Sequence, residues 1–180
     1  MKVCIIKIDD EITQIDKRAN LIDRKINNID KCDLYIIPRI RLSGSEKLKE
    51  YNYRLLRDLS VKYESVFGNL FTEKNNEVLF NSFMFVDKEN ILGVVRSRVI
   101  KDNKIYKNFI SINNQNVYFN LENEEINNCK FIIQYNNDNL KEIASKYKVP
   151  VIYYDTNKYK ISVFDDDEEI IINNEYIFEV

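Results

Sequence analysis

The chain of 180 residues contains no histidine and no tryptophan. Without histidine there is no imidazole general base, no Ser-His or Cys-His pair, and no zinc site of the kind that needs imidazole. The chain also contains only three glycines and two prolines. This scarcity excludes collagen-like sequence, glycine-rich phosphate-binding loops and long flexible linkers. Several classes of protein are therefore removed before any motif is considered.

Charge is nearly balanced, with 27 Lys and Arg against 29 Asp and Glu, a net charge of −2 and an isoelectric point near 5.4. This composition argues against a strongly basic nucleic-acid binder. No stretch approaches the roughly 20 apolar residues that span a membrane. The first ten residues carry a charge inside their apolar run, unlike a signal peptide. We therefore predict a cytoplasmic protein that binds neither nucleic acid nor membrane.

The three cysteines are Cys4, Cys32 and Cys129. An odd, widely spaced set without a CxxC motif is no disulfide framework, and it fits a reducing cytoplasm. A free cysteine usually fills a small space in a protein core. The sequence therefore favours a structural role for each of the three thiols.

Hydrophobic spacing predicts an α/β protein with no break in composition, and hence a single domain over residues 1–180. Apolar residues three and four apart predict amphipathic helices over residues 11–31 and 46–64, the second opened by the capping-box spacing of Ser43 and Glu46. A short helix around Leu140–Tyr147 should stop before Pro150. Apolar runs predict strands over Val3–Ile8, Leu34–Ile37, Val66–Phe71, Val78–Val86, Ile91–Ile100, Ile105–Ile112, Val117–Leu121, Phe131–Tyr135, Val151–Tyr154, Ile161–Phe164, Glu169–Ile172 and Tyr176–Val180.

Three polar segments between these strands read as hairpin turns: residues 87–90, 113–116 and 165–169. The last of these, Asp165-Asp166-Asp167-Glu168-Glu169, lacks the spaced oxygen ligands and the central glycine of an EF-hand loop. We therefore predict a solvated turn there, and neither a metal nor a cofactor for the chain.

Four short segments, in order along the first hundred residues, resemble motifs of the nitrilase (carbon–nitrogen hydrolase) family. An acidic residue and an apolar run lead into a proline, a Leu-Ser-Gly follows, and two strand segments resemble the family's Tyr-Asn-Ser and Leu-Gly-x-Tyr-Arg-Lys. These segments are Asp33-Leu34-Tyr35-Ile36-Ile37-Pro38, Leu42-Ser43-Gly44, Phe80-Asn81-Ser82 and Ile91-Leu92-Gly93-Val94-Val95-Arg96. The resemblance implies a shortened α-β-β-α sandwich of two mixed sheets with the helices outside.

Enzymes of this family use a Glu as proton carrier, a Lys that stabilises the tetrahedral intermediate, and a Cys nucleophile. The resemblance places the Glu at Arg39, the Lys at Ser97 and the Cys at Glu122. A guanidinium does not deprotonate in proteins, a serine hydroxyl carries no positive charge, and a carboxylate is no thiol. The joint loss of all three roles predicts a pseudoenzyme, with no catalytic residue at these positions.

For two residues the sequence leaves two alternative roles open. Arg39 either turns an amide site into an anion-binding pocket or is a surface arginine that pairs with local carboxylates. Cys129 either is a displaced nucleophile or fills space ahead of a strand. Three functions therefore stay open: a catalytically inactive protein that binds a partner or small ligand, a divergent C–N hydrolase using Cys129 or a carboxylate, and a product without selected activity. For partners, the resemblance implies a homodimer or another protein.

Overall fold

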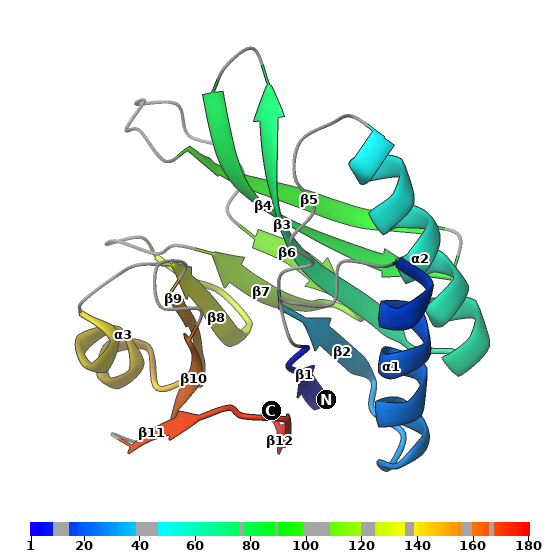
Figure 1. The fold of residues 1–180 in the computed structure, drawn as a ribbon. Helices are drawn as coiled ribbons and strands as arrows, with labels where there is room; N and C mark the ends of the chain where they lie inside the picture. Colours follow the sequence, from blue (N-terminus) through cyan, green and yellow to red (C-terminus); the bar gives the residue numbers. More distant parts are fainter. Residues whose placement is uncertain are drawn as a thin grey trace. The chain divides into compact units, whose positions relative to one another are not determined.

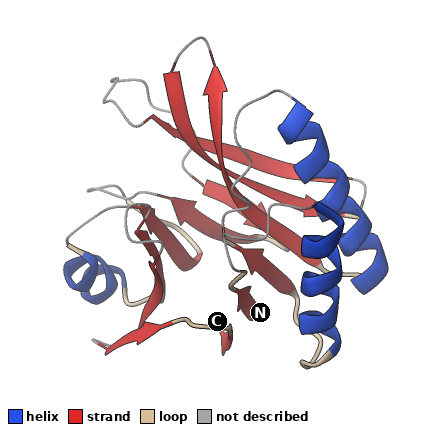
Figure 2. Cartoon of the chain, viewed as in Figure 1, coloured by secondary structure: helices blue, strands red, loops and turns tan. Residues whose placement is uncertain are grey.

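The computed structural model describes residues 1–8, 15–38, 47–75, 78–88, 90–98, 109–119, 125–135, 139–155, 160–165 and 168–180. The chain divides into two compact units: unit 1 comprises residues 1–104 with 174–179, and unit 2 comprises residues 105–173 with Val180. Each unit contains one six-stranded mixed sheet (Figures 1 and 2). These sheets and the helices beside them confirm the predicted α/β class, whereas a single domain over residues 1–180 stays a prediction.

Unit 1 consists of β1 (Lys2–Ile6), α1 (Ile15–Asn27), β2 (Leu34–Ile37), α2 (Lys47–Tyr63), β3 (Val66–Asn75), β4 (Val78–Asp87), β5 (Asn90–Arg98) and β12 (Glu175–Glu179). Its strand order is β12-β1-β2-β3-β4-β5. The strands β1, β2 and β3 are parallel neighbours, and the other pairs are antiparallel. The parallel strands need crossover connections, which α1 and α2 provide.

Unit 2 consists of β6 (Phe109–Ile112), β7 (Gln115–Phe119), β8 (Cys129–Tyr135), α3 (Leu140–Tyr147), β9 (Val151–Asp155), β10 (Lys160–Asp165) and β11 (Glu168–Ile171). Its strand order is β11-β10-β9-β8-β7-β6, with β7, β8 and β9 parallel. The helix α3 buries Leu140, Ile143 and Ala144 against this sheet. After β11 the chain returns to unit 1, where β12 pairs with β1.

The core of unit 1 lies between one face of its sheet and the two helices. Ile22 and Ile26, one helical turn apart on α1, are 0% and 2% exposed, and they pack in one cluster with Cys4 and Ile6 of β1. Leu56 of α2 is fully buried in the same cluster. Burying one such aliphatic side chain stabilises the fold by roughly 1.5–3 kcal/mol. Packing of these apolar stripes explains why both helices lie along the sheet.

The predicted turn over residues 113–116 is shorter in the structure. Asn113 and Asn114 alone form it, with φ values of 50° and 62°, and β7 begins at Gln115. Asparagine tolerates this left-handed conformation better than most residues, and two such residues in succession suit a tight hairpin. The predicted hairpin over 87–90 joins β4 and β5, whose register runs out to the pair Asp87 and Asn90.

Among the described residues of the unit 1 core, the buried side chain of Asn69 has no hydrogen-bond partner. Asn69 on β3 stands opposite Ile37 of β2 and Met84 of β4, which both face the helices, so Asn69 faces them too. Its side chain is fully buried, and neither the amide oxygen nor the amide nitrogen is paired. A buried amide without a partner lowers stability, because water would have satisfied both groups in the unfolded chain.

We expect Asn69→Leu, which keeps the branched shape of the side chain and replaces both polar atoms by methyl groups, to raise the free energy of unfolding by about 1–3 kcal/mol. Urea unfolding followed by circular dichroism measures this change. The matched variant Asn69→Asp should lower the free energy of unfolding, since it adds a charge at the same enclosed position. A lower urea midpoint for Asn69→Leu would show that the amide has a role that an apolar group cannot fill.

Polar side chains of α1 and α2 contact one another, and we call this contact between Asp23, Lys62 and Tyr63 the polar clamp. Asp23 on α1 forms an ion pair with Lys62 and accepts a hydrogen bond of 2.6 Å from the Tyr63 hydroxyl, both on α2. The Tyr63 hydroxyl also lies 3.2 Å from Oδ1 of Asn27. The hydrogen bonds from Lys62 and Tyr63 lower the pKa of Asp23.

We expect Tyr63→Phe to lower the free energy of unfolding by about 1 kcal/mol, the usual value of one hydrogen bond. Asp23→Asn should cost more at neutral pH, because it also removes the ion pair. The pKa of Asp23 is lower in the folded state, so its contribution is full above the unfolded value of about 3.9 and is lost as pH falls through the folded value. Urea unfolding at pH 7 and near pH 2 checks both points; equal effects of Asp23→Asn at both pH values would contradict the clamp.

Candidate functional site

The position that the resemblance gives to the catalytic Glu follows the carboxyl end of β2. This strand is flanked by parallel β1 and β3, and it ends at Ile37 ahead of the buried Pro38. Proline has no backbone N–H and therefore suits the end of a paired strand. Arg39 itself lies outside the described residues.

The position of the family Lys, Ser97, lies in β5 and pairs with Asn81 of β4. The strand β5 runs parallel to β2, because two antiparallel steps through β4 separate it from β3. Across the sheet, Ile37 of β2 pairs with Asn69 of β3, and Asn69 pairs with Met84 of β4. Met84 pairs in turn with Val94 of β5, so Ile37 and Val94 lie at the same level of the sheet. Ser97 is three residues beyond that level, so β2 and the Ser97 segment reach the same end of the unit 1 sheet. The register therefore places the segments leading to two of the three expected positions at the same end of the sheet, on strands separated by β3 and β4.

The position of the family Cys, Glu122, lies outside the described residues. The last described residue before it is Phe119, at the carboxyl end of β7 in unit 2. The strand predicted over Val117–Leu121 is thus present, although it begins at Gln115.

Cys129 lies at the opposite end of the β7–β8 pair from Phe119. The two strands are parallel, with Cys129 level with Asn116 at the start of β7 and Ile133 level with Phe119 at its end. Three residues of a strand rise by roughly 10 Å. Cys129 therefore begins β8 at the amino end of these strands, whereas the position that the resemblance gives to the nucleophile comes after Phe119 in the sequence.

The environment of Cys129 keeps its thiol protonated. Its Sγ donates to the Phe131 carbonyl oxygen at 3.4 Å. Burial raises the pKa of the Cys129 thiol to about 11, against the opposing effect of the backbone groups of Tyr118 and Phe131. A nucleophilic cysteine has a pKa below the free value of about 8.5. Position and protonation both favour the space-filling role of Cys129.

The other two thiols are also core residues. Cys4 and Cys32 are 0% and 1% exposed. Burial is the largest cause that raises the pKa of each, to about 12 for Cys4, where the neighbouring Cys32 and Glu175 add to it. Neither thiol is available as a nucleophile in the folded protein.

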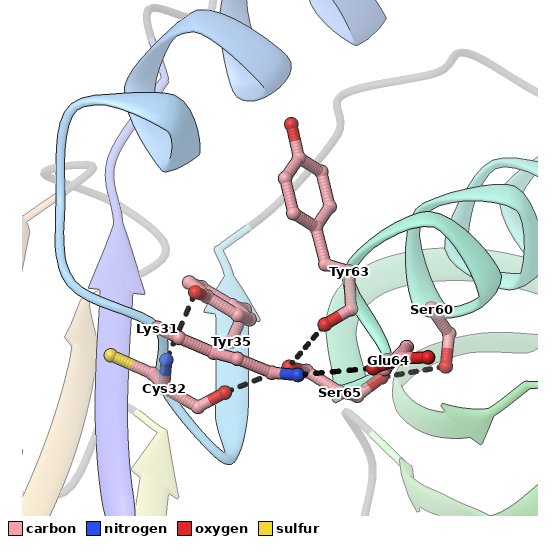
Figure 3. A network of polar contacts seen from close by, with 7 residues as sticks. All are labelled: Lys31, Cys32, Tyr35, Ser60, Tyr63, Glu64 and Ser65. Carbon is pink, nitrogen blue, oxygen red and sulfur yellow. Dashed lines mark hydrogen bonds and ion pairs between the residues drawn. The ribbon is translucent and has the colours of Figure 1, made fainter.

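A buried network of hydrogen bonds lies at the amino end of β2, the end away from Pro38 (Figure 3). The Cys32 backbone N–H donates to the Tyr35 hydroxyl at 3.0 Å, and the Ser65 hydroxyl lies 2.8 Å from the Cys32 carbonyl oxygen. The Ser60 hydroxyl donates to the Ser65 carbonyl at 2.6 Å and accepts from the backbone N–H of Lys88. These bonds tie the end of α2 to the segment before β2 and to the turn after β4, so the network is structural.

Sequence reasoning missed this network. Its visible signal was a pair of serines, Ser60 and Ser65, at the end of a helix and just before an apolar strand. Their 0% and 5% exposure became clear only in the structure.

In the acidic segment over 165–169, Asp165 ends β10, Glu168 and Glu169 begin β11, and residues 166–167 of the predicted turn lie outside the described residues. The two strands pair antiparallel from Ser162 and Ile171 out to Asp165 and Glu168. Glu169 forms an ion pair of 2.5 Å with Lys160, and this hydrogen bond lowers the pKa of Glu169. Among the described residues no group of three or more Cys, Asp or Glu is placed to hold a metal ion. Across the same residues no helix has the length and apolar character needed to cross a membrane.

The arrangement of strands and helices is that of a known superfamily. No family model and no curated protein matches the chain, but solved structures of the nitrilase superfamily do match it. The chain therefore has the α/β fold of the nitrilase, or carbon–nitrogen hydrolase, superfamily, which confirms at the level of fold the resemblance seen in the sequence.

The matching solved structures differ in the share of their own length that this chain covers. An amidase mutant from Nesterenkonia sp. AN1, with acrylamide added to its active-site cysteine, gives a TM-score of 0.71 at 7% identity, covering 100% of this chain and 93% of the amidase. Nit3 of Saccharomyces cerevisiae gives 0.65 at 11% identity, covering 98% and 88%. The glutamine-dependent NAD+ synthetase of Acinetobacter baumannii gives 0.60 at 14% identity; 98% of this chain is covered, but only 44% of the synthetase.

Proposed function

We propose that this chain is a catalytically inactive protein with the nitrilase fold, which acts by binding. The proposal rests on the chemistry of the residues at the three positions matched to the family's Glu, Lys and Cys. At these positions, respectively, Arg39 cannot act as a general base, Ser97 has no ammonium group and Glu122 has no thiol. The one thiol near them in sequence, Cys129, is protonated and begins β8 instead of following β7. These findings weigh against a divergent C–N hydrolase that uses Cys129 as its nucleophile.

The bound ligand in this proposal is a small carboxylate, held by Arg39 where the family holds an amide or nitrile. A guanidinium presents a rigid, planar set of donors that pairs with both oxygens of a carboxylate. A glutamate at that position would repel the same ligand. The replacement of glutamate by arginine therefore changes the charge of the ligand that the site prefers. A protein partner or a second copy of the chain, and a cytoplasmic location, stay predictions.

The test measures binding and hydrolysis on the same samples. Thermal unfolding is recorded with a panel of mono- and dicarboxylates and with the corresponding amides and nitriles, and ammonia release is assayed for the amides and nitriles. We expect at least one carboxylate to raise the melting temperature, with a stabilisation of about 2.7 kcal/mol at a hundred times its Kd. We expect no ammonia above the buffer level.

Arg39→Gln should weaken the binding of that carboxylate by about tenfold or more, since a charged hydrogen bond is worth roughly 1.5–3 kcal/mol. Arg41→Gln, two residues further on, changes the charge equally and serves as the matched control; it should leave the affinity unchanged. Equal losses of affinity in both variants would show that the effect comes from the net charge of the protein and not from a specific contact with Arg39. Ammonia release by the parent chain would refute inactivity, and the absence of any binder would favour a product without selected activity.

A further inference from the structure

We draw no further inference here: the strongest candidate, the unpaired side-chain amide of Asn69 in the unit 1 core between β3 and the helices, is fully enclosed in the described part of the chain, and nothing in the structure shows a ligand that reaches it.

Discussion

In the folded protein, Cys129 should react with iodoacetamide about 100-fold more slowly at pH 7.5 than a free cysteine, because burial raises its pKa from 9.0 to about 11 and only the thiolate reacts. Its rate should keep rising up to about pH 11. Cys4, with a pKa raised to about 12 and no exposed surface, should react only when the chain opens. Mass spectrometry of the alkylated peptides, over time and pH, resolves the three thiols separately.

The control is the same reaction in a denaturing concentration of urea. There the three cysteines should become nearly equal, since burial no longer acts on them. Cys129→Ser should also leave any carboxylate binding and the absence of hydrolysis unchanged. If Cys129 instead reacts fast at neutral pH with an apparent pKa below 8.5, it is an activated nucleophile. The proposal of an inactive protein would then fail.

Gly68→Ala should strongly destabilise unit 1. Gly68 on β3 stands opposite Phe85 of β4, and a Cβ added there would lie 2.7 Å from Cδ1 of Phe85 and 2.9 Å from Cε1 of Phe83. Both rings are buried, at 0% and 2% exposure, and they pack against each other with centroids 4.9 Å apart. They have little room to yield, so we expect a loss of about 3 kcal/mol, at the upper end of the usual cost of overpacking.

A double-mutant cycle separates this clash from other effects of the alanine. Phe85→Leu alone should destabilise the fold, because it leaves a cavity. Combined with Gly68→Ala, the leucine should recover part of the loss, since it removes ring atoms that the new methyl group meets. Urea unfolding of the parent, the two single variants and the double variant gives the coupling energy. Strict additivity, or an unchanged midpoint for Gly68→Ala, would contradict the proposed close packing.

The sequence predicts where the helices and strands lie along the chain better than it predicts which strands pair with one another. The strand Leu34–Ile37 has the predicted bounds because a proline ends it. The second helix, predicted over residues 46–64, spans Lys47–Tyr63 and is thus one residue shorter at each end. Both follow from local signals, namely periodicity and helix-ending or strand-ending residues. Which strands pair, and in which register, depends on contacts between distant residues that no local pattern contains.

The same limit applies to the candidate site. The replacements at Arg39 and Ser97 can be read directly from the motifs beside them. That Cys129 is level with Asn116 and distant from Phe119 requires the β7–β8 register. Similarly, Asn69 lies inside the predicted strand Val66–Phe71, and only its pairing with Ile37 and Met84 reveals it as an unpaired core amide.

The pairing of β12 with β1 has a consequence for synthesis on the ribosome. Val3 pairs with Phe178, which is 175 residues later in the chain, so this edge of β1 stays uncovered until that segment has been made. The contact between Lys25 and Glu175, with their charged atoms 3.4 Å apart, forms at the same late stage. At about 5–20 residues per second, the intervening chain takes roughly 10–35 s to make. During that interval β1 presents an open backbone edge, which is the region of the nascent chain that we expect a chaperone to protect.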